Sequence, residues 1–305
     1  MKWEKLGLVW GPDGSMQWAR NSALQPTAML LDDDVIRVYV GLRDDSGVGR
    51  VGFVDVAADD PTRVIGISKA PALDIGRPGT FDENGVVPTA LVRRSDEVYL
   101  YYAGYQLGQK VRFLAFGGVA VSNDGGATFT RVHEVPVTDR TDDELYFRVI
   151  HSIFEERGVW RAWYGAGSTF VPYEGKTLPV YDIRYMESPD GFTFPGRGRV
   201  VVPLGSSDEN RVGRPYVLRR GDRYLMFFGA ATKKENYRLT CADSRDGIEW
   251  TRRDDQIGIE PTPGSWDSDM QAYPCVIEAG GRFYLFYNGN EYGKAGFGCA
   301  VLREW

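Results

Sequence analysis

One pattern recurs five times along the 305 residues of this chain and ends each time in a glycine. An apolar stretch is followed by a polar turn, an aromatic-rich stretch and then Gly41, Gly104, Gly165, Gly229 or Gly289. Successive glycines stand 63, 61, 64 and 60 residues apart. Such regular spacing is typical of a repeat architecture, in which each module is one supersecondary unit.

Each repeat predicts two β-hairpins. In PTALVRRSDEVYLYYAG (88–104), alternating aromatic and aliphatic residues flank a polar turn, as paired strands on a half-buried sheet require. A second hairpin is marked by Ser-x-Asp-Gly in SNDGGATF (122–129), SPDGFTF (188–194) and SRDGIEW (244–250), because Gly accepts the positive φ of the turn. Four strands repeated five times predict an all-β, five-bladed β-propeller that forms a single domain over residues 1–305.

The two ends of the chain predict how the propeller closes. After Gly289 only one strand-like stretch remains, GFGCAVL (296–302), so the fifth repeat is one strand short. The stretch KLGLVW (5–10) belongs to no repeat and is expected to pair with it. This pairing would close the ring and remove an exposed sheet edge.

Composition narrows the classes of function. The formal net charge of -6 and the lack of a basic run argue against nucleic acid as a partner. There is no apolar run of membrane-spanning length and no apolar leader, so we expect a protein that does not enter membranes. The 3 cysteines are widely spaced, which favours a reduced cytoplasm over a disulfide framework or a zinc site. We expect no cofactor and no metal, since no phosphate-binding glycine motif or calcium loop is present; oligomeric state stays open.

Polar residues gather just before the first strand of every repeat. In a propeller the innermost strands line the centre, and the loops that lead into them meet at one mouth. The five leading loops are QWARNSALQP (17–26), GTFDENGVVP (79–88), DDELYFRVIH (142–151), SDENRVGRP (207–215) and SWDSDMQAYP (265–274). We therefore expect their acids, arginines, amides and aromatic rings to converge on one funnel.

These residue types predict a sugar site. Two carboxylates can divide acid and base roles, because burial raises one pKa while a neighbouring arginine keeps the other group ionised, and their separation sets inversion or retention. The expected catalytic carboxylates are Asp82 and Asp269, followed by Asp267 and Glu209. Aromatic rings can stack on sugar faces, while arginines and amides can hold hydroxyls or an anionic group. The expected substrate-binding residues are Arg20, Gln25, Arg43, Asn84, Tyr146, Arg148, His151, Arg211, Arg214, Trp266, Tyr273 and Asn288.

Each of these residues also has a structural alternative. An acid ahead of a strand is often a turn acceptor or a solvated surface charge. An arginine beside an acid can form a structural pair between blades. His151 stands where the other repeats have proline, and it could be a packing residue or could face the channel.

Several motifs resemble those of glycosidase-type propellers. They are FDENGVVP, AVSNDGGATF, YDIRYMESPDG, CADSRDGIEWTRRDDQIGI and WDSDMQAYP…YNGNEYGKAGFGCAV. The resemblance covers essentially the whole chain and extends to arabinanases, β-xylosidases, invertases and mannosyl phosphorylases. It is strongest to uncharacterised glycosidase-like propellers associated with surface-polysaccharide genes. It implies a five-bladed fold and a sugar ligand.

The resemblance weakens at the catalytic positions. Arabinanase-type enzymes place an Asp base before the first inner-strand proline, where this chain has Gln25, and a second Asp where it has Val87. Their Glu acid has no counterpart among Ile150, Arg214 and Tyr273. Any acid and base must therefore come from the leading loops.

The predicted function is that of a glycoside hydrolase-like enzyme acting on a sugar or sugar conjugate. Two alternatives stay open: a non-catalytic carbohydrate-binding propeller, or an isomerase, lyase or transferase of glycan or natural-product assembly. The fold cannot separate them, because propellers host many activities.

Overall fold

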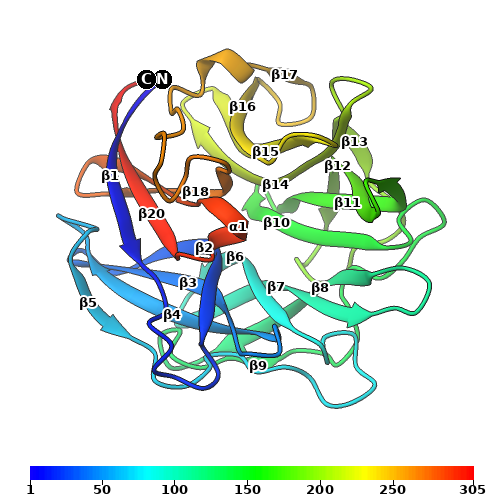
Figure 1. Cartoon of the computed structure of the whole chain (residues 1–305), viewed down its shortest axis with the longest axis horizontal. Coiled ribbons are helices and arrows are strands. Elements are labelled where there is room, and N and C mark those ends of the chain that lie inside the picture. The colour runs from blue at the N-terminus through cyan, green and yellow to red at the C-terminus, as the bar shows by residue number, and fades with distance from the viewer.

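Strands make up most of the computed structural model, which describes residues 1–305 (Figure 1). The strands are β1 (Lys2–Trp10), β2 (Asn21–Asp32), β3 (Val35–Arg43), β4 (Gly49–Ala57), β5 (Val64–Ile67), β6 (Val86–Arg94), β7 (Glu97–Leu107), β8 (Phe113–Ser122), β9 (Thr130–Arg131), β10 (Phe147–Glu156), β11 (Val159–Tyr173), β12 (Lys176–Ser188), β13 (Arg199–Val202), β14 (Glu209–Arg220), β15 (Arg223–Thr232), β16 (Arg238–Ser244), β17 (Trp250–Arg252), β18 (Ala272–Ala279), β19 (Arg282–Asn288) and β20 (Phe297–Glu304). Helical structure is limited to a 3-10 turn at Asp254–Gln256 and to α1 (Asn290–Gly293). The fold is all-β, as the sequence predicts.

Antiparallel pairing divides the strands into ladders that follow the sequence repeat. The ladders are β2 to β5, β6 to β9, β10 to β13, β14 to β17, and β18 to β20 with β1. Short parallel contacts join β8 to β10 and β12 to β14. In Figure 1 the ladders are arranged around a centre, and the first strand of each, β2, β6, β10, β14 or β18, lies nearest to it. We call these five the inner strands.

The two ends of the chain lie side by side (Figure 1). Strand β1 pairs antiparallel with β20, so that Trp3 lies opposite Leu302 and Lys5 lies opposite Ala300. This is the pairing that the sequence predicts for the stretches 5–10 and 296–302. The last ladder therefore takes its fourth strand from the opposite end of the chain.

Hydrophobic side chains fill the spaces between neighbouring ladders. Each of the five largest clusters combines residues from two neighbouring ladders. Trp163 of β11 packs in one cluster with Phe228 of β15, and Ile36 of β3 packs in another with Phe286 of β19. Full burial of one large apolar side chain contributes about 1.5–3 kcal/mol. The ladders are therefore held together by apolar contacts, including those between the first ladder and the last.

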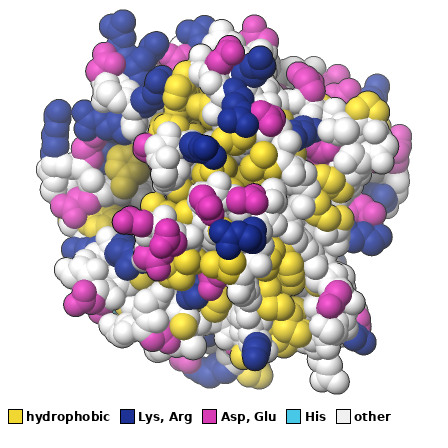
Figure 2. All heavy atoms as spheres, turned by 90° about the vertical axis from the view of Figure 1, so that its left-hand side faces the viewer, with side chains coloured by type: hydrophobic (Ala, Val, Ile, Leu, Met, Phe, Trp, Pro, Cys, Tyr) yellow, Lys and Arg dark blue, Asp and Glu magenta, His cyan; other side chains and the backbone are white.

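The outer surface carries charges of both signs. Figure 2 shows the side that lies on the left in Figure 1, where Lys and Arg side chains alternate with Asp and Glu among smaller hydrophobic areas. Exposed charges of the protein also form pairs, as in the bidentate contact of Arg77 with Glu134 at 2.9 and 2.8 Å. No helix of the structure has the length and the apolar surface needed to cross a membrane.

The Ser-x-Asp-Gly segments form the predicted turns. In the third ladder, the Asp190 carboxylate accepts hydrogen bonds from the backbone amides of Thr193 at 2.7 Å and Phe192 at 2.8 Å. Gly191 has a φ of +83°, which is the left-handed conformation that favours glycine. The hydroxyl of Ser188 accepts from the Gly191 amide. The turn is therefore closed by side chains of the motif itself.

These turns also connect neighbouring ladders. An aromatic side chain on the second strand of one ladder donates to the backbone carbonyl of a turn glycine in the next. The three contacts are Tyr39 to Gly126 at 2.7 Å, Tyr101 to Gly191 at 2.8 Å and Trp163 to Gly247 at 2.9 Å. The motif thus recurs because it serves both as a turn and as an acceptor between ladders.

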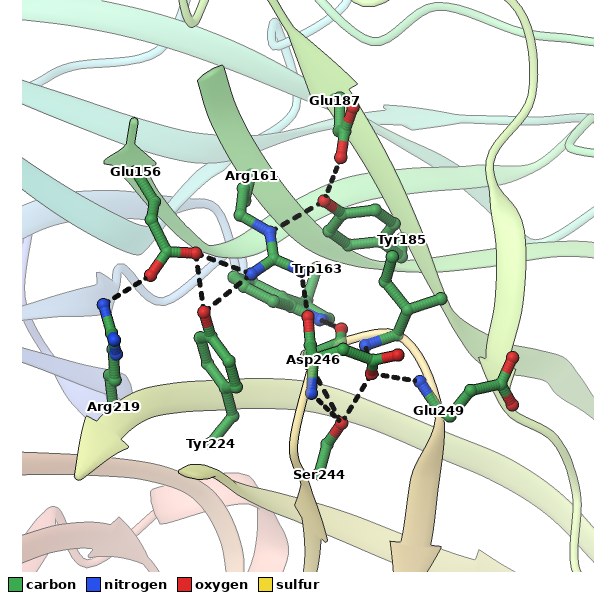
Figure 3. A network of polar contacts seen from close by, with 12 residues as sticks. Glu156, Arg161, Trp163, Tyr185, Glu187, Arg219, Tyr224, Ser244, Asp246 and Glu249 are labelled. Atoms are coloured by element: carbon green, nitrogen blue, oxygen red, sulfur yellow. Dashed lines mark hydrogen bonds and ion pairs between the residues drawn. The ribbon is translucent and has the colours of Figure 1, made fainter. Parts of the chain in front are cut away.

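The third and fourth ladders share a larger polar network (Figure 3). Its centre is the buried guanidinium of Arg161, which donates to Glu156, Tyr185, Tyr224 and the Asp246 carbonyl. The ion pair with Glu156 measures 2.8 Å. Four of the five N–H groups of Arg161 are thus used within the protein, so this network is structural.

Candidate functional site

All five inner strands have a backbone irregularity at the equivalent position of the repeat. Each has a register shift at or next to the proline, or to the histidine that replaces it in β10. Gln25, Arg214 and Tyr273 precede those prolines with φ values of +54°, +58° and +59°. A non-glycine residue in this conformation costs about 1–3 kcal/mol, and such bulges re-aim side chains. The structure therefore stores strain where three inner strands pass the centre.

Arg214 lies at this level and connects four inner strands. From β14, its guanidinium donates to the Thr89 carbonyl of β6 at 2.6 Å and to the Thr27 hydroxyl of β2 at 2.8 Å. It also reaches the His151 carbonyl of β10 at 3.4 Å. Arg214 is 3% exposed, and desolvation lowers its pKa to about 10. The Arg214 guanidinium therefore connects the inner strands at the centre of the molecule and is not exposed to solvent.

Tyrosines from four ladders gather beside this centre. Tyr237 lies 6.0 Å from Tyr273 and 6.4 Å from Tyr292, measured between ring centroids, and Tyr273 stacks on Tyr292 at 6.4 Å. The Tyr181 hydroxyl contacts that of Tyr237. Tyr105 and Tyr181 pack against the same small apolar cluster, which includes Ala103 and Phe147. We call this set the tyrosine cluster; its members are Tyr105, Tyr181, Tyr237, Tyr273 and Tyr292.

The cluster combines buried and accessible rings. Tyr237 is buried, Tyr105, Tyr181 and Tyr273 are half-buried, and Tyr292 is 37% exposed. Burial raises the pKa of Tyr105, Tyr181 and Tyr273 above the usual value, so their hydroxyls stay neutral. The cluster therefore offers ring faces together with hydroxyls that can donate and accept hydrogen bonds.

Two arginines border the tyrosine cluster. Arg211 on β14 donates to the Tyr292 hydroxyl at 3.2 Å and to the Thr232 carbonyl at 3.3 Å. Its guanidinium lies 5.0 Å from the ring centroid of Tyr237. Arg43 ends β3; burial raises the pKa of Tyr105 and Tyr273, and the positive charge of Arg43 acts against this rise. This side of the molecule therefore combines aromatic rings with cationic side chains.

The expected catalytic residue Asp82 lies elsewhere. It is 0% exposed and accepts hydrogen bonds from Thr80 at 2.9 Å and from Tyr102 at 3.1 Å. Arg131 on β9, the outermost strand of this ladder, pairs with it at 2.7 Å. The carboxylate is thus enclosed between strands of its own ladder and has no free oxygen to offer a substrate.

Asp267 has the corresponding place in the last ladder. It is 0% exposed and accepts from Gln271 at 3.0 Å and Tyr287 at 3.0 Å. Lys5 on β1, the outermost strand, lies at 2.5 Å. Burial acts to raise the pKa of Asp267, but these donors and the charge of Lys5 outweigh it and hold the pKa below its usual value.

The same arrangement recurs with variations in the third and fourth ladders. Glu144 is fully buried and contacts the Tyr164 hydroxyl, Arg148 at 2.8 Å and Arg184 at 3.1 Å. Glu209 forms a bidentate pair with Arg252, with both contacts at 2.9 Å. These acids recur before the inner strands because each ties a leading loop to the outer strands. The geometry places Asp82, Asp267 and Glu209 in internal ion pairs, so their acid and base roles stay predictions from the sequence.

Asp269 differs from these three carboxylates. Its side chain is exposed and forms no ion pair. Its backbone amide donates to Asn290 at 2.8 Å, and Asn290 begins the turn that carries Tyr292. Of the four expected catalytic carboxylates, it alone lies free in solvent beside the tyrosine cluster.

The expected substrate-binding residues divide into two groups. Arg43, Arg211 and Tyr273 belong to or border the tyrosine cluster. Arg214 lies beneath them, with Gln25 and His151 beside it. Burial, and then the charge of Arg214, lower the pKa of His151 well below its usual value, so this imidazole is neutral.

The remaining expected residues have contacts within the fold, and their role in substrate binding stays a prediction from the sequence. Asn288 is buried and binds the Gln25 amide and the Ala23 carbonyl, both at 2.7 Å. The other residues of this group are Arg20, paired with Asp45; Asn84, which accepts from the Leu107 amide; Tyr146, packed on Phe170; Arg148, paired with Glu144; and Trp266, packed on Tyr287. Their packing and pairing explain why they recur in the leading loops.

Sequence reasoning missed four residues of the cluster. These are Tyr105, near the end of the second strand β7, and Tyr181, Tyr237 and Tyr292, which lie beyond the second strands of their ladders. Tyr105 and Tyr292 follow closely after Gly104 and Gly289. The sequence signal that could have identified Tyr105 and Tyr292 is an aromatic residue shortly after a repeat glycine.

Two surface hollows lie on other parts of the molecule. One of about 730 Å³ is lined by Asp142, Asp143, Ser168, Arg184, Arg197, Gly198, Arg199 and Val200. The other, of about 520 Å³, lies around Thr80, Gln106 and Arg140. In the first, each arginine side chain already has an acidic partner. The structure brings no three His, Cys, Asp or Glu side chains together in a way that could hold a metal ion.

The arrangement of the ladders is a β-propeller fold that this protein shares with solved glycoside hydrolases. The protein superposes on a thermostable family-43 glycoside hydrolase with a TM-score of 0.70 and 15% identity, over 93% of its own length and 90% of that of the hydrolase. It superposes on BT0996 in an RGII complex with a TM-score of 0.71 and 19% identity, over 98% and 91% of the respective lengths. At these low sequence identities the comparisons show that the fold is shared, and nothing more.

The protein belongs to the same family as uncharacterized protein Rv1502 of Mycobacterium tuberculosis. The two sequences are 35% identical over 304 residues, which is 100% of the length of each. No family profile matches the sequence.

Proposed function

We propose that this protein is glycosidase-like and acts on a sugar or sugar conjugate held at the tyrosine cluster. The observation that carries the proposal is that Tyr105, Tyr181, Tyr237 and Tyr273 come from four different ladders and meet beside the inner strands. Because these rings belong to separate ladders, the contacts among them do not stabilise strand pairing within a ladder. The gathering is explained if the rings bind a common ligand.

The chemistry of the cluster suits a polyhydroxylated ligand. Tyrosine rings present apolar area at low entropic cost, and neutral hydroxyls can exchange hydrogen bonds with sugar hydroxyls. Glycosidase-type neighbours with the same propeller fold, and a further neighbour in an RGII complex, favour a carbohydrate over other small molecules.

Hydrolysis is the first reaction to test at this site. A glycosidase needs one carboxyl group as acid and a second as base or nucleophile. Asp269 is the remaining candidate, since it is exposed, forms no ion pair and lies next to the turn that carries Tyr292. If Asp269 takes part in hydrolysis, Asp269→Asn abolishes product release from aryl glycosides without lowering the melting temperature. Equal rates in both proteins would remove Asp269 from the reaction.

Binding without hydrolysis is the second candidate function. The observation that favours it is that Asp82, Asp267 and Glu209 are already held in internal ion pairs. Gln25 and Val87 also occupy positions where the resemblance to arabinanase-type enzymes leads one to expect aspartates. In that case a sugar raises the melting temperature and no product is released.

The test is a screen of neutral and acidic monosaccharides and of nucleotide sugars, with thermal shift and calorimetry as readouts. We expect Tyr292→Ala to weaken sugar binding about tenfold, which corresponds to about 1.4 kcal/mol. The matched control is Tyr173→Ala, at the tip of the β11–β12 hairpin and outside the cluster. Equal losses in the two variants, or no binding by the wild type, would contradict a sugar site at the tyrosine cluster.

We also infer that the ladders are the five blades of a closed ring. The pairing of β1 with β20 and the cluster that joins Ile36 to Phe286 support closure. A cytoplasmic location and a role in surface-polysaccharide assembly remain predictions from the sequence. Fractionation of the native host and inspection of the neighbouring genes would test them.

A further inference from the structure

The arginines at the tyrosine cluster have no acidic partner. Arg43, Arg211 and Arg214 take part in no ion pair. Arg211 contacts the tyrosine cluster directly, through the Tyr292 hydroxyl at 3.2 Å and the Tyr237 ring centroid at 5.0 Å. Buried arginines elsewhere in the protein are paired, as in Arg148 with Glu144 and Arg161 with Glu156, each at 2.8 Å. The absence of a carboxylate is therefore specific to this region.

An unpaired buried cation is costly to keep. Arg211 is 6% exposed and Arg214 is 3% exposed, and the Nε–H group of each has no hydrogen-bond partner. Buried charges are normally paired, and a buried donor without an acceptor costs about 1–3 kcal/mol or more for a charged group. The formal net charge of the chain is -6, so acidic side chains are abundant elsewhere. A partner that is not part of the chain would compensate this cost.

Backbone strain holds a tyrosine against Arg211. Glu291 and Tyr292 are consecutive non-glycine residues with φ values of +52° and +60°. Each such residue costs about 1–2 kcal/mol. The Tyr292 hydroxyl accepts a hydrogen bond from Arg211, so the strained turn positions the exposed ring beside the guanidinium. Strain of this kind collects at ligand clamps.

We propose that the ligand of the tyrosine cluster carries an acidic group, a carboxylate or a phosphate, which binds between Arg211 and Arg43. This inference rests on the proposed function and names the substrate class of the same site. Charge-assisted hydrogen bonds from guanidinium to oxyanions are about twice as strong as neutral ones. Arg43 makes no side-chain hydrogen bond within the protein, so all of its donors are free to receive the ligand. Arg214 adds positive charge from below.

The experiment compares glucose, glucuronic acid and glucose 6-phosphate by calorimetry on the full-length protein, with inorganic phosphate as the probe without a sugar. We expect at least one acidic sugar to bind about tenfold or more tightly than glucose, with an affinity that falls as ionic strength rises. Arg43→Met should remove most of this preference, because the acidic group loses one of its two guanidinium partners. Arg211→Lys tests the second arginine while keeping its charge, and the exposed Arg63→Met is the matched control.

The outcomes separate the two proposals. If glucose and both acidic sugars bind equally, the acidic group is refuted and the sugar site stands. If inorganic phosphate binds as tightly as the sugar phosphate, the arginines bind an anion and the sugar site is refuted. If the acidic sugars keep their preference in Arg43→Met and in Arg211→Lys, the assignment to these two arginines is wrong. If no compound binds, both proposals fail.

Discussion

Replacing Lys5 by methionine removes the only cationic partner of a fully buried carboxylate. The Lys5 ammonium lies 2.5 Å from Asp267, whose side chain is 1% exposed. Lys5 belongs to β1, which joins the last ladder from the opposite end of the chain. The substitution therefore tests how strongly the N-terminal strand is held.

The magnitude follows from the burial of the pair. Removing one partner of a buried ion pair costs about 3–5 kcal/mol, because the other charge is left uncompensated. Lys5 is 22% exposed, so we expect the lower end, about 3 kcal/mol. Unfolding entropy is about 2.1 cal/mol/K per residue, so in a chain of 305 residues this loss lowers the melting temperature by about 5 °C.

The effect should depend on pH. In the folded protein the pKa of Asp267 is lowered: burial acts against this, but the donors Lys5, Gln271 and Tyr287 outweigh it. A depressed carboxyl pKa stabilises the protein above the unfolded value of about 3.9, and this stabilisation is lost as the pH falls. The difference between the wild type and Lys5→Met should therefore be full at pH 7 and shrink below about pH 4.

The assay is calorimetric or urea-induced unfolding of both proteins at neutral and at acidic pH. Lys2→Met is the matched control, since Lys2 on the same strand is 69% exposed and lies 3.8 Å from Glu304. Such a surface pair is worth about 0–1 kcal/mol. Equal losses in the two variants, or a Lys5→Met effect that does not change with pH, would refute the reasoning.

Two further predictions concern the contacts between ladders. Deleting residues 1–10 leaves β20 without its partner β1 and should lower the melting temperature far more than Lys5→Met does; an unchanged thermal scan would argue against closure by this strand. Tyr101→Phe removes the hydrogen bond to the Gly191 carbonyl in the next ladder and should cost about 1–3 kcal/mol in urea unfolding, because a buried acceptor is left unpaired. Tyr99→Phe, whose hydroxyl bonds only to Glu97 of the same strand, should change stability by less, and the reverse order would contradict the role of the turn.

The ladders of this protein follow from local signals in its sequence. The hairpin predicted at residues 88–104 corresponds to β6 and β7, and the Ser-x-Asp-Gly turns lie where the motif predicts them. Alternation of side chains and the conformational needs of a turn act over a few residues, so a single sequence displays them directly. Even the pairing of β1 with β20 follows from counting strands in the repeats.

The site depends on contacts that no local signal reveals. An acid before an inner strand has the same local sequence whether it points toward the centre or toward the outermost strand. Asp82 points outward because Arg131, 49 residues away, pairs with it there. Arg214 meets the Pro26 carbonyl across 188 residues, and it supports the cluster from beneath because four inner strands pass the same level.

The sequence by itself determined the repeats, their turns and the all-β fold. Only the tertiary structure decided which polar groups form hydrogen bonds or ion pairs within the protein and which are free to bind a ligand. The physical reason is that a charged group pairs with the nearest partner in space, and packing of distant ladders chooses that partner.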